Sequence, residues 1–298
     1  MCSQAIKSYF SILINLLIKM ESNKKLLTNL QTWTDDPNTY EKVFLDYSKT
    51  FERLGADQKQ ANRFAELVLS SIKNASTIED AESKVKKFFE TEKVNGKTVF
   101  EMIRDGLAGR FQIMFSQLER FLDGVKGKVI DYGCGSGTFT QILHDSLGLD
   151  IEGVDVRDFR ASNITVPVKV FDGYSVPVAD KYYSCAVLTN VIHHEFDNEK
   201  ILAELDRITA KKLVIIETVP EADNDENAKQ DWGRMILNDS LWNRFFNYAN
   251  IPVPGSYETP FTWIKRFEKY GWKCTHSKDL GFDQPTIQDR HHLMVFEK

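Results

Sequence analysis

The chain has 298 residues, 42% of them hydrophobic, and its 38 lysines and arginines are outnumbered by 43 aspartates and glutamates. The hydrophobic content is enough for a folded core, so the composition excludes a disordered chain. The net charge of −5 argues against nucleic acid as a partner, because phosphate binding depends on clustered lysine and arginine.

The first twenty residues contain an apolar run, residues 9–20, behind Lys7. The run is too short to span a bilayer and no small-residue cleavage site follows it, so we expect a short packed helix and no membrane partner. Met20 followed by Glu21 has the form of an ordinary start. Residues 1–19 are therefore interpreted as an extension, and whether they belong to the natural protein stays open.

The four cysteines, Cys2, Cys134, Cys185 and Cys274, are scattered without the spacing of a zinc site. We predict neither a disulfide framework nor a structural metal. Reduced thiols are typical of the cytoplasm, which is the expected location.

Apolar residues recur at helical spacing over residues 40–121, with little strand signal. Two capping boxes, Ser76 with Glu79 and Thr98 with Glu101, predict two of the helix starts.

Two glycines, Gly106 and Gly109, interrupt the last of these helices. A glycine inside a helix costs about 1 kcal/mol relative to alanine, so their presence calls for a structural or functional reason. We predict that residues 1–125 form an all-helical N-terminal region. Such a region packs as a layer or covers a substrate pocket and excludes water, and we expect a mixture of the two.

Residues 129–137 combine an apolar run, an acid and three glycines at alternate positions. They predict a strand that ends near Asp131, a tight turn, and a helix from Thr138 to Leu147. A glycine turn between a strand and a helix lies at the carboxyl edge of an open α/β sheet, where such folds bind nucleotide-like ligands. The spacing is G-x-G-x-G, not the G-x-G-x-x-G of dinucleotide binding. The acid before the first glycine disfavours a pyrophosphate and suits an ammonium or sulfonium.

Further predicted strands follow, and several end in polar residues. They span residues 150–155, residues 166–171 before Asp172 and Gly173, and residues 184–188 before Thr189 and Asn190. A fifth strand, residues 213–217, is a continuous apolar run of the kind buried between two helical layers. The alternation of strands and helices predicts a parallel sheet.

Residues 220–258 interrupt this alternation. An acidic stretch gives way to an aromatic-rich segment with helical spacing, which predicts a helical insertion after the fifth strand. Its aromatic side chains belong either to a substrate lid or to a core shared with the N-terminal helices. Thr259 and Pro260 then start another helix, and strands over residues 272–277 and 293–296 complete the sheet.

The segment Asp131-Tyr132-Gly133-Cys134-Gly135-Ser136-Gly137 resembles the first motif of the class I S-adenosylmethionine-dependent methyltransferases. Residues 189–194, Thr-Asn-Val-Ile-His-His, are similar to the N-V-L-H-H segment of the small-molecule members. The resemblance covers about residues 126–218, with a weaker tail to 298. It implies an α/β fold over residues 126–298, with a Rossmann-like, mostly parallel seven-stranded sheet, helices on both faces and an antiparallel last strand.

The resemblance also implies S-adenosylmethionine as cofactor and a site that holds it. Asp155 would accept the ribose hydroxyls, Asp172 would meet the adenine amine, and Asp131 would orient the turn or meet the ammonium. Arg110 is the candidate for the methionine carboxylate, with Arg104 as a substitute and a surface arginine as the alternative. The expected cofactor-binding residues are Arg110, Asp131, Tyr132, Gly133, Gly135, Gly137, Asp155, Val156, Asp172, Gly173, Thr189 and Asn190.

Methyl transfer to a hydroxyl, phenol or carboxylic acid gains from a general base, and histidine is the usual one near neutral pH. His193 and His194 follow the fourth strand, and His291 and His292 open the last strand at the same edge. We take His193, His194 and His291 as candidate catalytic residues, with packing and cofactor lining as the alternative. No pair has helical metal-ligand spacing, so we predict no metal.

The sequence thus predicts a cytoplasmic methyltransferase that acts on an oxygen or nitrogen of a small molecule. One alternative is a methyltransferase-like fold that has lost catalysis and serves as a cofactor-binding or regulatory module. Another is a nicotinamide-dependent oxidoreductase, against which the glycine spacing and the lack of a Tyr-x-x-x-Lys pair count. The acceptor and the oligomeric state are left open.

Overall fold

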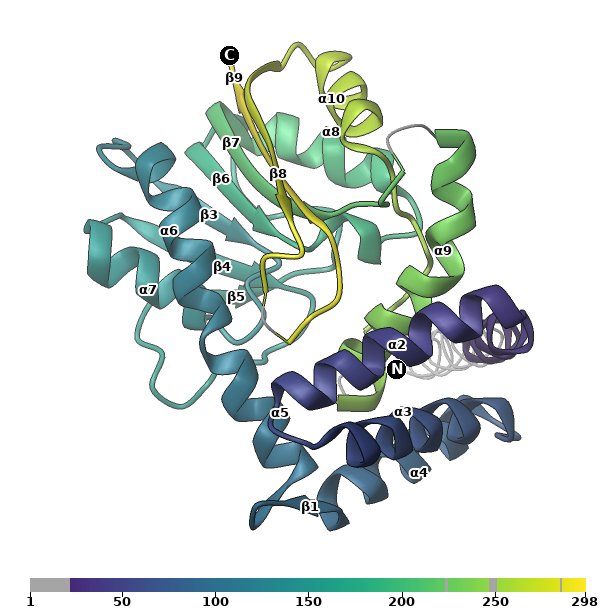
Figure 1. Cartoon of the computed structure of the whole chain (residues 1–298). Coiled ribbons are helices and arrows are strands. Elements are labelled where there is room, and N and C mark those ends of the chain that lie inside the picture. Colours follow the sequence, from purple (N-terminus) through teal and green to yellow (C-terminus); the bar gives the residue numbers. More distant parts are fainter. Residues whose placement is uncertain (1–21, 223–224, 247–250, 285) are drawn as a thin grey trace, which may run out of the picture. The chain divides into compact units, whose positions relative to one another are not determined.

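The computed structural model describes residues 22–222, 225–246, 251–284 and 286–298 (Figure 1). The apolar run at residues 9–20 lies outside the described residues. The chain divides into two compact units, one made of Met1–Met102 with Ile236–Ile251 and the other of Ile103–Met235 with Pro252–Lys298. We call them the helical unit and the sheet unit.

The helical unit contains a helix over residues 22–35 and helices α2 (Pro37–Arg53), α3 (Gln58–Lys73) and α4 (Ile78–Thr91). Its core is aromatic: the ring centroid of Phe64 lies 5.5 Å from that of Phe51 and 5.1 Å from that of Phe88.

The starts of the helices follow local capping chemistry. The side chain of Thr77 accepts the backbone N–H of Asp80, so α4 starts one residue later than the predicted Ser76–Glu79 box. The Thr98–Glu101 box is confirmed, because the Glu101 carboxylate accepts the Thr98 N–H at 2.8 Å and Thr98 Oγ1 accepts the Glu101 N–H at 3.2 Å.

A short hairpin stands among these helices. Strands β1 (Lys93–Val94) and β2 (Lys97–Thr98) pair antiparallel across Asn95 and Gly96, whose φ angles are 51° and 85°. Asn-Gly is the strongest short sequence signal for such a turn. The prediction of an all-helical region over residues 1–125 missed this hairpin.

The sheet unit contains the seven-stranded sheet that the sequence predicts. Its strands are β3 (Val129–Tyr132), β4 (Ile151–Asp155), β5 (Val168–Val170), β6 (Tyr183–Thr189), β7 (Thr209–Thr218), β8 (Lys273–Gly281) and β9 (His291–Glu297). Their order is β5-β4-β3-β6-β7-β9-β8, with the first five parallel and β9 antiparallel to both of its neighbours. The mostly parallel α/β fold is confirmed.

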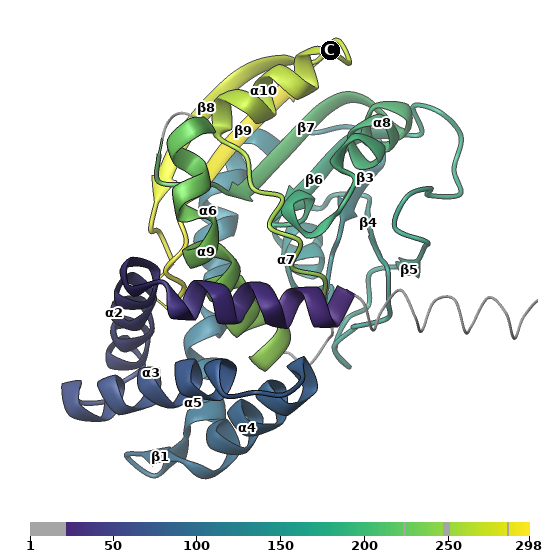
Figure 2. The ribbon, with the colours of Figure 1, turned by 90° about the vertical axis from the view of Figure 1, so that its right-hand side faces the viewer.

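Helices cover both faces of this sheet (Figure 1). Helices α6 (Arg110–Leu122) and α7 (Thr138–Leu147) pack on one face, and α8 (Asn198–Ile208) and α10 (Pro260–Glu268) pack on the other. Figure 2 shows α10 against β8 and β9. Helix α6 belongs to the sheet unit, so the division between the units falls before the predicted boundary at residue 125.

The strand residues alternate between the two faces. Val129 and Val214 join the core under α6 and α7, whereas their neighbours Ile130 and Ile215 join the core under α8 and α10. A strand buried on both faces carries apolar residues at every position, which is why β3 and β7 appear in the sequence as continuous apolar runs.

The predicted insertion after the fifth strand of the sheet is helical. Helix α5 (Val99–Ala108) and the insertion helix α9 (Asp225–Ser240) both cross the division between the units, and the π-helix η2 (Leu241–Phe246) follows α9. The roles of residues 1–125 as a cover and of residues 220–258 as a substrate lid stay predictions.

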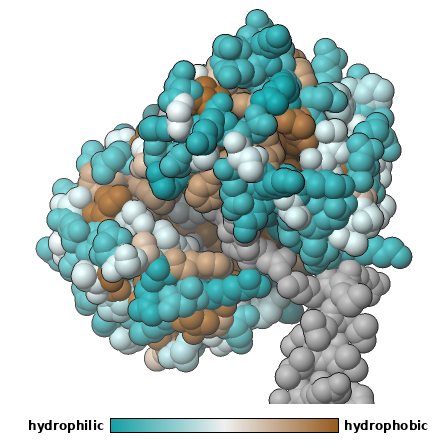
Figure 3. Space-filling view, turned by 90° about the horizontal axis from the view of Figure 1, so that it is seen from below, coloured by the Kyte–Doolittle hydropathy of each residue, from teal (hydrophilic) through white to brown (hydrophobic). Residues whose placement is uncertain are grey.

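Among the described residues, no helix combines the length and the apolar character needed to cross a membrane. Hydrophilic residues cover most of the face seen in Figure 3, and its apolar residues gather in separate patches.

The strand order reverses between β3 and β6, and the segments that follow these strands pack tightly together. A Cβ built on Gly133 would lie 2.6 Å from Cγ2 of Val191, and Gly133 has a φ of +77°. Glycine is therefore needed there for backbone conformation and for space.

We expect Gly133→Ala to destabilise the protein more than Gly148→Ala does. Gly148 also has a positive φ of +63°, but a Cβ built there meets no described atom within 4 Å. The left-handed conformation costs both variants about 1–2 kcal/mol. Overpacking against Val191 adds about 1–3 kcal/mol in Gly133→Ala alone. Urea unfolding of the two variants measures the difference, and equal losses would contradict the packing argument.

Candidate functional site

The glycine turn after β3 lies at the carboxyl edge of the sheet, beside the point where the strand order reverses. Gly133, Gly135 and Gly137 all have positive φ angles, as the sequence predicts, and Gly137 is the N-cap of α7. A Cβ built on Gly135 would meet no atom of the described residues within 4 Å. The backbone at Gly135 therefore faces open space that a ligand can approach.

Asp155 ends β4 and contacts this turn directly. The backbone N–H of Gly135 donates to its Oδ2 at 2.7 Å, and the N–H of Val156 donates to its Oδ1 at 2.7 Å. Burial raises the pKa of Asp155, although these hydrogen bonds oppose the shift. The structure thus brings together the acid of β4 and the glycine turn, which are 20 residues apart in the chain.

Asp131 lies beneath the turn and is almost fully buried. Thr140 Oγ1 donates to its Oδ2 at 2.6 Å, whereas Oδ1 has no hydrogen-bond partner among the described residues. Burial raises the pKa of Asp131 to about 7; the bond from Thr140 opposes this shift and the charge of Asp155 adds to it. Asp131 therefore changes charge near neutral pH.

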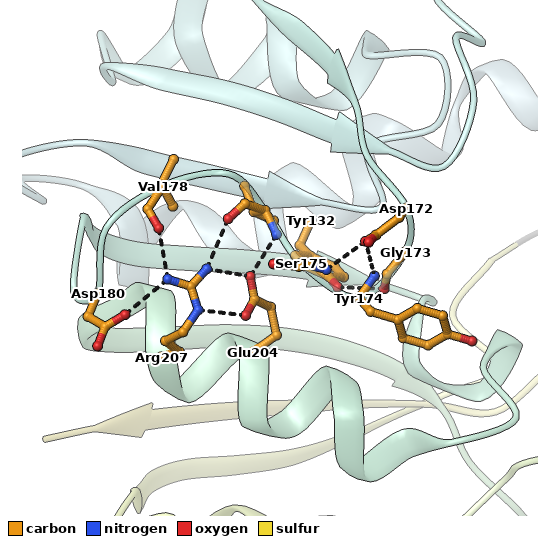
Figure 4. Close-up of polar contacts among 10 residues, drawn as sticks. Tyr132, Asp172, Gly173, Tyr174, Ser175, Val178, Asp180, Glu204 and Arg207 are labelled. Carbon is orange, nitrogen blue, oxygen red and sulfur yellow. Dashed lines mark hydrogen bonds and ion pairs between the residues drawn. The ribbon is translucent and has the colours of Figure 1, made fainter. Parts of the chain in front are cut away.

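Asp172 follows β5 in a tight turn (Figure 4). Its Oδ1 accepts the backbone N–H groups of Tyr174 at 2.8 Å and Ser175 at 2.7 Å, and these bonds lower the pKa of Asp172. Tyr132 is buried in the core, and its hydroxyl donates to the carbonyl of Gly173 at 3.0 Å. Tyr132 therefore acts on this edge by fixing the turn.

The segments after β4 and β5 lie side by side. A Cβ built on Gly173 would come within 3.2 Å of Cγ1 of Val156, so the two residues are close neighbours. The side chain of Val156 is half exposed beside Asp155. An apolar surface therefore lies next to the acid.

Arg207 on α8 holds the loop that follows Asp172 (Figure 4). Its guanidinium donates to the carbonyls of Val176 at 2.9 Å and Val178 at 2.8 Å, and it pairs with Glu204 and Asp180. Glu204 in turn accepts the N–H of Val176 at 2.7 Å. Sequence reasoning missed this group; its only local signal is the Glu204–Arg207 spacing on one helix face.

The segment after β6 forms a short 3-10 turn, η1 (Ile192–His194), held by Glu217 of β7. The Glu217 carboxylate accepts the N–H groups of Ile192 at 3.0 Å and Thr218 at 3.1 Å, and it contacts Nδ1 of His193. His193 and Glu217 are both buried. This pair fixes the shape of the turn.

The other histidines near this edge have different surroundings. Nδ1 of His194 lies 2.9 Å from the carbonyl of Pro252, and the ring of His193 lies between those of His194 and Tyr257. His292 points to β8, where its Nε2 lies 2.8 Å from Oγ of Ser277.

His291 is the buried member of a chain of partly buried polar groups at the carboxyl edge. Its Nδ1 lies 2.6 Å from Oδ1 of Asp283, and Gln117 of α6 donates to Oδ2 of Asp283 at 2.7 Å. Its Nε2 lies 3.5 Å from Nδ2 of Asn190, the residue after β6, which adopts a φ of +56°. Sequence reasoning singled out His291 and Asn190 but gave Gln117 and Asp283 no role.

Arg110 starts α6 close to this chain. Burial lowers the pKa of Arg110, and the charges of Asp283 and Asp289 oppose that shift. Its Nε is buried and makes no hydrogen bond to any residue that the structure describes. The structure therefore gives Arg110 two carboxylates of the β8–β9 connection as charged neighbours.

The comparisons with known proteins agree with this fold. A family model described as a methyltransferase domain matches residues 107–277, more than half of the chain. The chain belongs to this family, and the resemblance to class I methyltransferases is confirmed. No curated protein sequence matches the chain.

Several solved structures are similar in fold. An S-adenosylmethionine-dependent methyltransferase from Mesorhizobium loti matches with a TM-score of 0.45 and 14% identity, over 62% of this chain and 98% of that one. Geranyl diphosphate C-methyltransferase from Streptomyces coelicolor matches with a TM-score of 0.47 and 13% identity, over 72% and 97%. A putative methyltransferase of Haloferax volcanii, in complex with the activator Trm112, matches with a TM-score of 0.45 and 16% identity, over 64% and 95%.

We expect Arg207→Met to loosen the loop after Asp172, because it removes two bonds to loop carbonyls and the partner of Glu204. Hydrogen bonds to charged groups contribute about 1.5–3 kcal/mol each, so the local opening free energy should fall by at least about 2 kcal/mol. Hydrogen exchange of residues 172–178 measures this change. Arg160→Met is the matched control, since Arg160 pairs with Asp158 on the surface. Unchanged exchange in Arg207→Met would contradict the holding role.

Asp131 predicts a pH dependence of stability. The pKa of Asp131 is about 7 in the folded state, against an ordinary value of 3.8. Between these two pH values the folded state still holds the proton of Asp131, whereas the unfolded state has lost it. Stability should therefore fall as the pH rises from about 4 to about 7. In Asp131→Asn this part of the fall should disappear, because the amide does not ionise. Urea unfolding across this range measures the slope, and identical slopes in both proteins would contradict the shifted pKa.

Proposed function

We propose that this chain transfers a methyl group from S-adenosylmethionine to a small-molecule acceptor. The observation that carries the proposal is the contact between Asp155 and Gly135, which sets a carboxylate against a glycine turn whose backbone faces open space. Membership of the methyltransferase domain family supports it. S-adenosylmethionine supplies a methyl group on a positive sulfur, so the protein's task is mainly to position the acceptor.

The residues present fit this cofactor. The ionised carboxylate of Asp155 has about four acceptor sites, and backbone N–H groups of Gly135, Val156 and Arg157 bond to it, so an acceptor site remains for a ribose hydroxyl. Val156 offers an apolar surface for the adenine beside Gly173. Asp172 uses only Oδ1 in its turn, which leaves Oδ2 for the adenine amine.

Asp131 and Arg110 suit the charged methionine end of the cofactor. Oδ1 of Asp131 is a buried acceptor without a partner among the described residues, and an ammonium would supply one. A nearby positive charge favours the ionised carboxylate, so the cofactor would lower the pKa of Asp131. We retain Arg110 as the candidate for the carboxylate, because its buried Nε also needs a partner.

The loss of Asp155 should weaken cofactor binding. We expect Asp155→Asn to bind S-adenosylhomocysteine about 10- to 100-fold more weakly than the natural chain, because hydrogen bonds to a charged group contribute about 1.5–3 kcal/mol. Isothermal titration calorimetry measures the affinities. Asp150→Asn is the control, since Asp150 is exposed just before the start of β4. Equal affinity of Asp155→Asn and the natural chain would show that the ribose assignment is wrong.

Catalysis needs a separate experiment. The protein is incubated with the small-molecule fraction of a cell extract and with S-adenosylmethionine labelled in the methyl group. Labelled products would support the proposed activity. Binding of S-adenosylhomocysteine without any labelled product would favour the alternative of a cofactor-binding module without catalysis. The cytoplasmic location and the small-molecule acceptor stay predictions.

A further inference from the structure

We propose that His291 is the general base of the methyl transfer, that Asp283 and Gln117 position it, and that the acceptor is a hydroxyl group. This inference rests on the proposed function and deepens it. The observation behind it is the continuous chain of contacts from Gln117 through Asp283 and His291 to Asn190.

The register of the sheet places His291 at the carboxyl edge. Because β9 is antiparallel, its first residue pairs with the last residue of β7, Thr218. Asn190 follows β6, and its backbone N–H donates to the carbonyl of Ile216 in β7 at 2.8 Å. His291 and Asn190 therefore meet across the end of β7, on the same edge as the glycine turn.

Asp283 sets the tautomer of His291. Burial raises the pKa of Asp283, but the hydrogen bonds that it accepts from His291 and Gln117 oppose this and hold that pKa below the ordinary value. An ionised carboxylate only accepts hydrogen bonds, so the proton of neutral His291 lies on Nδ1. Nε2 then carries a lone pair that faces the Nδ2 amide of Asn190 at 3.5 Å, so an acceptor hydroxyl would take the place of this amide before His291 removes its proton.

Three buried polar atoms in and near this chain of contacts lack a partner in the described part of the protein and would suit a ligand. Oε1 of Gln117, Oδ1 of Asn190 and Nε of Arg110 are buried without a hydrogen-bond partner among the described residues. Buried polar atoms are nearly always satisfied in folded proteins. Gln117 and Asn190 stand at the two ends of the chain of contacts, and Arg110 is near enough to feel the charge of Asp283, so we infer that a bound molecule would supply partners for these atoms.

His193 also faces a carboxylate, but its partner has a different role. The carboxylate of Glu217 accepts backbone N–H groups, including those of Ile192 and Thr218, and so fixes the turn after β6. Asp283 accepts from side chains of two distant elements, and within the part of the chain that the structure describes no N–H of a turn like that of Glu217 is bonded to it. This difference selects His291 over His193.

In the proposed step His291 takes the proton of the acceptor hydroxyl while the methyl group is transferred. The acceptor oxygen forms a bond to the methyl carbon, the electrons of the sulfur–carbon bond stay on sulfur, and the hydroxyl proton passes to Nε2 of His291. Asp283 stabilises the resulting imidazolium, and the proton then leaves to solvent. Arg110 is also near enough for the charge of Asp283 to act on it, and Asp289 is a second negative charge near Arg110. An amine that arrives neutral needs no such base, so the arrangement favours a hydroxyl.

The first test measures rate and binding separately. We expect His291→Gln to lower methyl transfer to the extract fraction by about 100-fold or more, the usual share of a general base. Its affinity for S-adenosylhomocysteine should stay that of the natural chain, and the labelled products should be methyl ethers by mass spectrometry. His144→Gln is the control, because His144 lies on α7 against the carbonyl of Leu149. An unchanged rate, or labelled methylamines as products, would overturn the inference.

The second test reads the tautomer and needs no acceptor. In nitrogen NMR of the labelled chain with S-adenosylhomocysteine, His291 should carry its proton on Nδ1, and Asp283→Asn should move the proton to Nε2. A proton on Nε2 in the natural chain would overturn the positioning role. Failure of the natural chain to bind S-adenosylhomocysteine or to label any metabolite would instead count against the proposed function.

Discussion

The candidate site depends on one hydrogen bond, from the backbone of Gly135 to the carboxylate of Asp155. A carboxylate that is buried costs free energy unless hydrogen bonds compensate it, and here the backbone N–H groups of Gly135, Val156 and Arg157 do so. The bond ties the turn after β3 to the end of β4. Because Gly133 packs against Val191 after β6, the same turn is also fixed on its other side. The position of the glycine turn is thus set by both of its neighbouring strands, which leaves Gly135 facing open space.

Charge is distributed unevenly along this edge. At β3 and β4, Asp131 and Asp155 lie close enough for each charge to oppose the other, and burial raises the pKa of both. At the β8–β9 connection, Asp283 keeps its charge because His291 and Gln117 bond to it. Asp131 and Asp155 would therefore favour a cationic ligand beside β3 and β4. Asp283 would favour a positive charge that develops on the ring of His291. The carboxyl edge combines a region that attracts positive charge with a region that accepts a proton.

The sequence predicted the parts of this site that local patterns determine. The glycine turn and the places of Asp155 and Asp172 at strand ends followed from short motifs, because each acid stands where an apolar run ends. The supporting groups did not follow. Gln117 and Asp283 are 166 residues apart, and Arg207 reaches loop carbonyls about thirty residues earlier, so no periodicity joins them. Helix α6 was assigned to the cover region because helical spacing does not say which surface a helix packs on; Met114 and Leu118 pack it on the sheet.

The two histidine–carboxylate pairs show why a residue pattern alone does not assign a base. Both pairs are buried, and both lie at the ends of neighbouring strands, β7 and β9. The two pairs differ in the other hydrogen bonds that each carboxylate accepts. Glu217 collects backbone N–H groups, and its loss would change the path of the chain after β6. Asp283 accepts from the side chains of His291 and Gln117, and buried side-chain atoms of Gln117, Asn190 and Arg110 lack a partner among the described residues. A carboxylate that fixes backbone shapes the protein, whereas one that fixes an imidazole beside unsatisfied groups prepares a place for a substrate.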